Sequence, residues 1–368
     1  MTRIFTEEQE VKYLDTRLYG KNATPEQVKA IYRYDGFLPS EVRAILVRNG
    51  SFYGVLQENP REQFYLQDAT IHIPQFSGTG RELRYRRMME RNKELRGDVE
   101  IKAFWPEDDY RNTENNYRNM AYDCSVGLFV PEAKHEGRRV FSGTDIRDIR
   151  TITLGSTNAF AKMPLLNRGT SEYLRSQIID INGEKVLNLG YVYADQAGRL
   201  LEKILSEYHA LAVNSGKPIE LNLFMLGRVG GLGDGMRRHD LVFPTGILDE
   251  TDLSENRLFL NPVHNILSEG KKNTGHNLNV QNVLDETVEQ LVRAKEQGCV
   301  CIDMELSEST KAINLARIRY EGLKINFGVV GYVSDLPLQG DTLADELDSD
   351  KGEQEAAETI IEKIKERK

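Results

Sequence analysis

The chain has 368 residues, a length that fits two domains or one large domain with an extension. Hydrophobic residues make up 39% of the chain and charged residues 29%, which excludes a disordered composition. We find no apolar run of the roughly 18 residues that a membrane helix needs. The charged N-terminus also lacks the apolar region of a signal peptide, and three cysteines cannot form a disulfide framework. We therefore expect a cytoplasmic protein with no membrane partner.

The formal net charge of −9 is unevenly distributed. Residues 1–150 hold 24 basic and 24 acidic residues, so the remainder of the chain carries the whole acidic excess. An acidic chain is poorly suited to binding nucleic acid. Any anionic ligand must be held by a few local cations or by backbone N–H groups. The scattered histidines and cysteines leave little room for a metal cluster, and we expect no cofactor.

Residues 1–149 have a mixed, irregular pattern that predicts an α+β extension. We expect helices over 6–19, from Pro25 and over 40–50, strands over 51–57 and 64–74, and a loop over 105–123. The predicted helix 80–96 contains six arginines, which suit either Glu–Arg pairs on a solvated face or a cationic surface for phosphate or an acidic partner. A regulatory, lid or oligomerisation role fits this region, and no catalytic motif occurs in it.

From residue 150 onward, strands and helices alternate. We expect strands over 150–155, 185–190, 219–226, 240–248, 299–305 and 324–335, and helices over 195–216, 285–298, 306–322 and 353–368. Several of these strands are apolar throughout, which favours a parallel or mixed sheet covered on both faces. Residues 150–368 are thus predicted to form an α/β domain, a three-layer mixed sheet flanked by helices. Ligands of such sheets bind beyond the carboxyl ends of the strands.

A glycine-rich segment follows the predicted strand 219–226. Gly230 and Gly231 let the backbone approach a ligand closely, and bare N–H groups there can cradle an anion. Arg228 adds a planar set of donors suited to phosphate. The spacing matches neither the GxGxxG nor the Walker A loop. An ordinary turn with a surface arginine explains the segment equally well.

Two further motifs end buried strands. In Asp303-Met304-Glu305, a carboxylate can accept two hydrogen bonds from a ribose diol beside an adaptable apolar side chain; alternatively, Glu305 caps the next helix or makes an ion pair. Asp335 ends the strand 324–335 in a half-buried setting that can raise the pKa of a carboxylate and let it act as a general acid. A turn or N-cap aspartate explains Asp335 equally well. The shared position of the motifs at strand ends predicts a single site.

Taken in order, these motifs resemble the nucleoside phosphorylase/nucleosidase superfamily, and within it most of all the AMP nucleosidases. The stretch from Met225 to Leu232 resembles the family's Met-Ile-Gly-His-Cys-Gly-Gly-Leu, and the Asp-Met-Glu signature is identical. The stretch from Val333 to Asp341 matches Val-Ser-Asp-Lys-Pro-Leu-His-Gly-Glu in six of nine positions. Arg228-Val229-Gly230 departs from this pattern and instead resembles the phosphate site of hexameric purine nucleoside phosphorylases. The resemblance covers residues 150–368.

The resemblance implies cleavage of the N-glycosidic bond of a purine nucleotide or nucleoside, an AMP-like hydrolysis that releases free base and ribose or ribose 5-phosphate. In this scheme Asp335 is the general acid at N7 of the purine. Glu305 binds the ribose hydroxyls and favours the cationic sugar. The remaining implied substrate contacts are Met304, Ser334, Gly230, Gly231, Arg228 and Phe327, and the implied phosphate contacts are Arg228, Gly230, Gly155 and Ser156.

Several alternatives stay open at this point. Phe327 stacks on the base or simply packs in the core. Water or inorganic phosphate is the nucleophile, so a purine nucleoside phosphorylase is the competing enzyme. A non-catalytic nucleotide-binding regulatory protein on the same fold is the competing class. The superfamily also implies a homo-oligomer, because its sites are usually completed between subunits.

Overall fold

The computed structural model of the chain describes residues 2–19, 25–35, 65–67, 70–75, 79–97, 99–104, 146–169, 176–192, 194–249, 261–280, 283–343 and 350–367. A ten-stranded mixed sheet dominates the part after residue 150. Its strand order is β11-β10-β12-β13-β9-β5-β8-β7-β6, and β14 pairs with both β10 and β9. The predicted helix 40–50, strand 51–57 and loop 105–123 lie outside the described residues.

Where an element was predicted from the sequence, its observed bounds mostly lie within a few residues of the predicted ones. The strands are β5 (Thr151–Leu154), β6 (Leu165–Arg168), β7 (Ser176–Ile181), β8 (Glu184–Leu189), β9 (Ile219–Gly231), β10 (Leu241–Asp249), β11 (Asn261–Pro262), β12 (Thr274–Asn279), β13 (Cys299–Asp303) and β14 (Leu323–Asp335). The helices are α5 (Ala194–Ser215), α7 (Val288–Glu296), α8 (Leu306–Arg319) and α9 (Asp350–Glu366).

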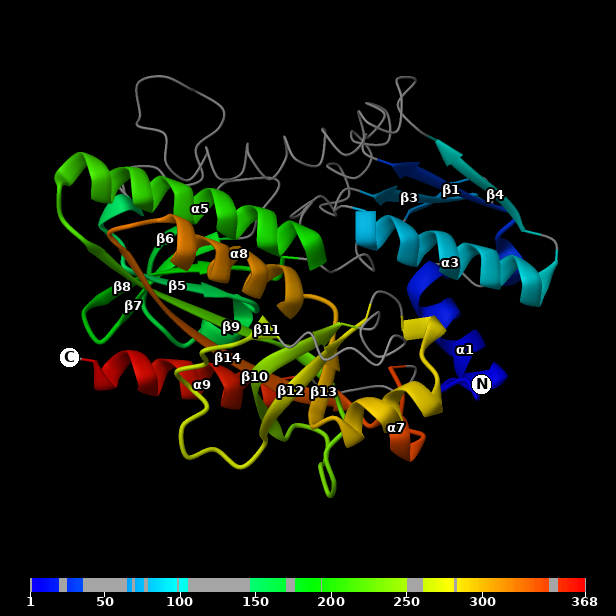
Figure 1. Ribbon diagram of the computed structural model, residues 1–368. Helices are drawn as coiled ribbons and strands as arrows, with labels where there is room; N and C mark the ends of the chain where they lie inside the picture. The colour runs from blue at the N-terminus through cyan, green and yellow to red at the C-terminus, as the bar shows by residue number, and fades with distance from the viewer. Residues whose placement is uncertain are drawn as a thin grey trace.

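Helices cover both faces of this sheet, which confirms the predicted three-layer α/β fold (Figure 1). Helices α5 and α8 lie side by side on one face, and α9 lies on the opposite face. Leu201 and Ile204 of α5 share a buried cluster with Leu223 of β9. Ile360 of α9 shares another with Phe224, the next residue of the same strand. Successive side chains of a strand point to opposite faces, so β9 is buried on both sides.

One end of the sheet closes into a ring of five strands. Strand β9 pairs with β14, β14 with β10, β10 with β12, β12 with β13, and β13 again with β9. Val229, Val242, Cys301 and Val333 come from four of these strands and share one small buried cluster. β9 and β14 run parallel through both the open sheet and the ring, so their carboxyl ends lie within the ring.

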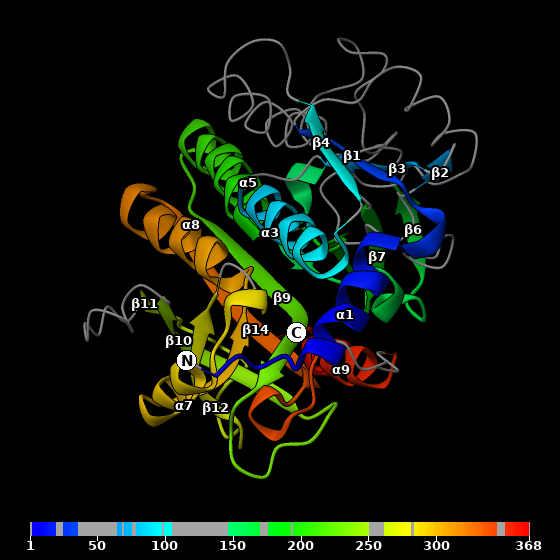
Figure 2. The ribbon, with the colours of Figure 1, turned by 90° about the vertical axis from the view of Figure 1, so that its right-hand side faces the viewer.

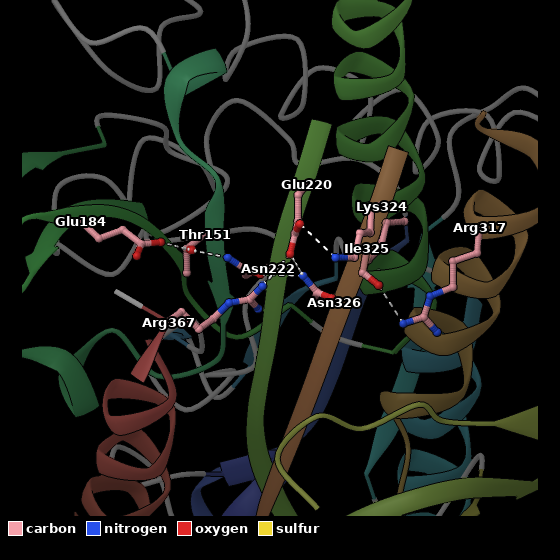
Figure 3. Close-up of polar contacts among 9 residues, drawn as sticks. All are labelled: Thr151, Glu184, Glu220, Asn222, Arg317, Lys324, Ile325, Asn326 and Arg367. Carbon is pink, nitrogen blue, oxygen red and sulfur yellow. Dashed lines mark hydrogen bonds and ion pairs between the residues drawn. The ribbon is translucent and has the colours of Figure 1, made fainter. Parts of the chain in front are cut away.

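The opposite ends of the central strands are joined by polar side chains (Figure 3). Asn222 of β9 donates to Thr151 Oγ1 of β5 at 3.1 Å, and Asn326 of β14 donates to Asn222 Oδ1 at 3.0 Å. Glu220 accepts from Asn326 at 2.6 Å and from Arg367, just beyond α9, also at 2.6 Å. These side chains form hydrogen bonds with one another and hold the strands together at their amino ends. The predicted functional residues lie at the carboxyl ends of the strands.

The N-terminal part contains a second, smaller sheet. Its strands β1 (Ala30–Asp35), β2 (Tyr65–Gln67), β3 (Thr70–Gln75) and β4 (Glu100–Phe104) have the order β2-β3-β1-β4. Helices α1 (Glu7–Leu14) and α3 (Thr79–Arg96) accompany it, and a single turn replaces the helix predicted from Pro25. Arg91 of α3 contacts both carboxylate oxygens of the buried Glu10 of α1, at 2.6 and 3.0 Å. The charge of Arg91 is thus used in an ion pair within the protein.

The segment of residues 2–19 packs against the large sheet. Tyr13, Leu14 and Leu18 lie in one buried cluster with Leu278 of β12 and Leu291 of α7. Helix α3 also contacts α5, as Figure 2 shows from the side. These contacts place the N-terminal segment in a core that it shares with the part after residue 150. The predicted domain boundary at residue 150 stays a prediction. None of the described helices is long and apolar enough to cross a bilayer.

Candidate active site

The three sequence motifs meet at Gly230 of β9. Asp335, the last residue of β14, is in register with Gly230 on one side. Ile302 of β13, directly before the Asp-Met-Glu motif, is in register with Gly230 on the other side. A methyl group on Gly230 would lie 2.7 Å from Ile302 and 3.5 Å from the Asp335 carboxylate. Glycine is favoured here because a methyl group would clash with Ile302, while its contact with the carboxylate would be an ordinary one.

The glycines continue the strand instead of forming the predicted loop. β9 extends to Gly231, five residues past the predicted end of the strand, and is flanked there by β13 and β14. The backbone of Gly230 therefore faces a neighbouring strand on each side, and Gly231 faces β13. The expected cradle of bare N–H groups does not form at Gly230. A run of glycines indicates a close approach, and here the approaching groups are protein side chains.

Asp335 is buried, with 7% of its surface exposed. The Ser334 hydroxyl lies 2.6 Å from Asp335 Oδ1. Ser334 Oγ also lies 3.2 Å from the carbonyl oxygen of Val229. The serine therefore links the carboxylate to the backbone of β9. This arrangement fixes the orientation of Asp335 at the end of the strand.

The residues after Asp335 form a tight turn that explains the rest of the motif. Pro337 begins a single 3₁₀ turn, and Gly340 follows it with a φ of 78°, a conformation that favours glycine. Leu336 and Asp341 close the turn as an isolated bridge, and Arg238 binds both oxygens of Asp341. The Pro-Leu-x-Gly pattern thus has a structural role, which is to return the chain sharply beyond Asp335.

Asp303 and Glu305 have different surroundings. Asp303 Oδ1 accepts from Asn277 Nδ2 at 2.7 Å and lies 3.4 Å from the N–H of Leu306, in the first turn of α8. Burial raises the pKa of Asp303 from 3.8 to about 6, although these hydrogen bonds oppose the shift. Glu305 stands at the N-cap position but makes no capping hydrogen bond with its side chain. The capping role considered for Glu305 therefore falls to Asp303. Glu305 and Met304 are both half-buried.

Gly155 and Ser156 lie at the end of β5, next to β9. Gly155 has a φ of 132°, and a methyl group on it would lie 2.5 Å from the carbonyl oxygen of Leu226. Only glycine fits where the chain after β5 lies against Leu226 of β9. Ser156 is buried, and its hydroxyl lies 2.9 Å from a carboxylate oxygen of Glu353 on α9. No sequence motif pointed to Glu353 as part of the site.

Arg228 joins the same group of residues. Its Nε donates to the hydroxyl of Tyr332 on β14 at 2.9 Å, and that hydroxyl donates to Glu353 Oε1 at 3.2 Å. Tyr191, two residues after β8, donates to the same oxygen at 2.7 Å. The two side chains predicted to bind phosphate, Arg228 and Ser156, are thus connected through one buried carboxylate. Local sequence patterns could not show this, since Ser156 and Glu353 are 197 positions apart.

Phe327 lies away from these residues. It is 1% exposed and belongs to the cluster beneath α5 and α8, eight positions before Asp335 on β14. At about 3.3 Å per residue, this separates the two residues by most of the length of the strand. The placement favours core packing over stacking on a base, and we leave Phe327 out of the site. Among the described residues, no three His, Cys, Asp or Glu side chains are grouped as a metal site requires.

No protein-family model and no curated protein matches the sequence. Solved structures do resemble the chain. A uridine phosphorylase from Schistosoma mansoni in complex with thymidine is 17% identical over 60% of this chain and 87% of its own, with a TM-score of 0.43. A purine nucleoside phosphorylase from Toxoplasma gondii in complex with immucillin-H is 15% identical over 61% and 95%, with a TM-score of 0.44.

A third similar structure is a nucleosidase. The 5′-methylthioadenosine/S-adenosylhomocysteine nucleosidase from Neisseria meningitidis, in complex with methylthio-immucillin-A, is 13% identical over 59% of this chain and all of its own, with a TM-score of 0.45. Likeness at TM-scores below 0.5 does not decide what this chain does. The function has to be inferred from the contacts of its own residues.

Proposed function

We propose that the chain is an enzyme of the nucleoside phosphorylase/nucleosidase class that hydrolyses the N-glycosidic bond of a purine nucleotide or nucleoside, with AMP-like compounds as the first candidates. The observation that carries the proposal is the meeting at Gly230. Strand pairing brings Asp335 and the strand before Glu305 to the two sides of one glycine, from positions far apart in the sequence. A general acid and a ribose-binding carboxylate are the two groups that this reaction needs.

The proposed reaction balances as a simple hydrolysis. As the bond between C1′ and N9 breaks, its electron pair moves to the purine, and protonated Asp335 gives its proton to N7 of the leaving base. The sugar becomes oxocarbenium-like, and the charge of Glu305 stabilises it while the carboxylate accepts hydrogen bonds from the ribose hydroxyls. Water adds to C1′ and loses a proton to solvent, and Asp335 regains its proton from solvent.

Two observations favour this assignment over a purely structural role for the motifs. The Glu305 side chain makes no capping hydrogen bond, because Asp303 accepts from the helix instead. Gly230 places no side chain beside the Asp335 carboxylate, which lies 3.5 Å from where a Cβ atom would stand. The phosphorylase remains the second candidate, because Arg228 and Ser156 are the donor types that bind phosphate. A non-catalytic nucleotide-binding protein is the third.

A substrate panel tests the proposal. The purified protein is incubated with AMP, adenosine, inosine, methylthioadenosine and uridine, with and without phosphate, and the free base is measured by chromatography. Base release without phosphate supports the nucleosidase, and strict dependence on phosphate supports the phosphorylase. Release of uracil alone would contradict a purine substrate. No release from any compound would leave only the binding protein.

The Asp335→Asn variant tests the role of the acid. The substitution keeps the shape of the side chain and removes the transferable proton, so we expect base release to fall by roughly 10²–10⁴-fold. Asp234→Asn is the matched control, since that aspartate is on the surface and pairs with Lys295. Undiminished activity in Asp335→Asn, with far-UV circular dichroism unchanged, would refute the proposed mechanism.

A further inference from the structure

Glu353 is a buried acidic residue that the proposed reaction does not use. It lies near the start of α9, on the face of the sheet opposite α5 and α8 (Figure 1), and is 8% exposed. Three hydroxyl groups surround its carboxylate: those of Ser156 at 2.9 Å, Tyr191 at 2.7 Å and Tyr332 at 3.2 Å. They come from three separate stretches of chain, so this side chain joins α9 to the ends of β5, β8 and β14.

The direction of the hydrogen bonds identifies Glu353 as the acceptor. Ser156 Oγ accepts from the N–H of Ala159 at 3.2 Å, so its own proton is available for Glu353. The Tyr332 hydroxyl accepts from Arg228 Nε at 2.9 Å, so its proton is also available for Glu353. Burial and the nearby carboxylate raise the pKa of Tyr191 and of Tyr332, which keeps both phenols protonated. All three hydroxyls can therefore donate to one carboxylate.

This arrangement conflicts with a phosphate ion bound by Ser156 and Arg228. Such an ion would need the Ser156 proton, which Glu353 already accepts, and would bring a second negative charge close to a buried carboxylate. Charges at close range repel strongly where water is excluded. The backbone offers no compensating cradle at Gly230, since this residue lies between β13 and β14.

We propose that Glu353 keeps inorganic phosphate out of the space between Ser156 and Arg228 and thereby reserves the reaction for water; this inference rests on the function proposed above. Glu353 is then a specificity-determining residue that acts through Ser156 and Tyr332. The Ser-Arg pair that would bind phosphate is present, but the carboxylate from α9 accepts the Ser156 proton and holds Arg228 Nε through the Tyr332 hydroxyl. The nucleophile is thus selected by a residue far from the glycine-rich motif in the sequence.

The first test uses the wild-type protein and phosphate itself. Thermal unfolding is followed at low, rising concentrations of potassium phosphate, against potassium chloride of equal ionic strength, so that the general stabilisation by phosphate as an excluded salt stays small. We expect no saturable rise of the midpoint in phosphate, because phosphate does not bind between Ser156 and Arg228. We also expect base release to be independent of phosphate. A saturable rise of the midpoint in phosphate, or base release that requires phosphate, would overturn the proposal without any variant being made.

The second test removes the charge of Glu353. The Glu353→Gln variant keeps the size of the side chain and one acceptor oxygen, and we expect it to bind phosphate about tenfold more tightly than wild type or better. Phosphate should then raise its unfolding midpoint and either inhibit base release or yield ribose 1-phosphate. Glu355→Gln, an exposed neighbour on α9, is the control and should behave as wild type.

The Tyr332→Phe variant tests the same link independently, in case Glu353→Gln does not fold. Tyr332→Phe removes the hydroxyl that links Arg228 to Glu353 but leaves the Ser156 contact, so we expect a smaller gain in phosphate binding. If Glu353→Gln and Tyr332→Phe both fold and neither gains phosphate binding, the proposal is wrong. If the wild type releases no base from any nucleoside, the proposed function fails, while the phosphate titrations still decide whether Glu353 excludes the anion.

Discussion

Asp303 and Glu305 show how two carboxylates at one strand end take separate roles. Asp303 is held by Asn277 and the first turn of α8, so its oxygens serve the fold. Glu305 follows two residues later at the N-cap position without a side-chain cap, so its charge is not used to start the helix. The sequence alone could not separate these roles, because capping depends on the φ and ψ angles at the turn as well as on residue type.

The raised pKa of Asp303 predicts a pH-dependent stability. Burial raises its pKa to about 6, so the folded protein holds this proton more tightly than the unfolded chain does between pH 3.8 and about 6. The stabilisation from this proton is complete below that window and is lost as the pH rises through it. We expect Asp303→Asn to gain stability relative to wild type by up to about 3 kcal/mol between the two ends of the window.

Urea unfolding at a series of pH values measures this effect. The difference in unfolding free energy between Asp303→Asn and wild type should grow as the pH rises toward neutrality. Asp234→Asn serves as the control, because its side chain is 93% exposed, and its difference from wild type should stay flat. Parallel curves for Asp303→Asn and wild type would show that burial does not hold the Asp303 proton.

The residues that could be predicted from the sequence are those with a local pattern. Asp335 ends an apolar strand, Glu305 follows another by two residues, and the chain order of their motifs resembles a known superfamily. Glu353 and Tyr191 have no such pattern, since one begins an amphipathic helix and the other follows a short strand. Only tertiary packing brings them to Ser156, as no local rule relates residues this distant in the chain.

At the scale of elements, strands with a continuous apolar run were predicted and polar or short ones were missed. β14 and β10 agree with their predicted ranges within one residue. β6, β7, β11 and β12 were not predicted. β12 has the sequence Thr-Gly-His-Asn-Leu-Asn, and it is stabilised by neighbours on both sides and by the buried Asn277 bonded to Asp303. Tertiary pairing here overrides a weak strand propensity.

The close contact between the end of β5 and its parallel neighbour β9 depends on Gly155, which predicts a sharp effect of Gly155→Ala. The φ of 132° is unfavourable for alanine, and the new methyl group would meet the Leu226 carbonyl oxygen at 2.5 Å. We expect a loss of about 3 kcal/mol in unfolding free energy. Gly216→Ala, at a φ of 63° with open space around it, should lose only about 1 kcal/mol. Equal losses of unfolding free energy for the two variants, measured by chemical denaturation, would mean that backbone strain and not the contact with Leu226 sets the cost.

For the whole molecule, the charge asymmetry and the change of pattern near residue 150 suggested a separate N-terminal partner. The structure places α1 in one core with β12 and α7, and the division itself stays a prediction. Backbone hydrogen bonds add to this contact: Ile4 donates to Glu286 and Val288 donates to Thr2. Gln9 also donates to the carbonyl oxygen of Gly340, in the turn after Asp335, at 2.9 Å. The N-terminal segment therefore supports the turn that follows the proposed acid.

If this core is shared, a change in the N-terminal segment must weaken the distant sheet. Leu14→Ala removes a side chain that is 1% exposed in the shared cluster and should cost about 3 kcal/mol. Amide hydrogen exchange of β12 and β13 should then accelerate together with that of residues 2–19, because one cooperative unit opens as a whole. Leu166→Ala, half-exposed on β6, should leave these rates unchanged. Faster exchange confined to residues 2–19 would instead define an N-terminal unit that unfolds independently, as the division at residue 150 predicts.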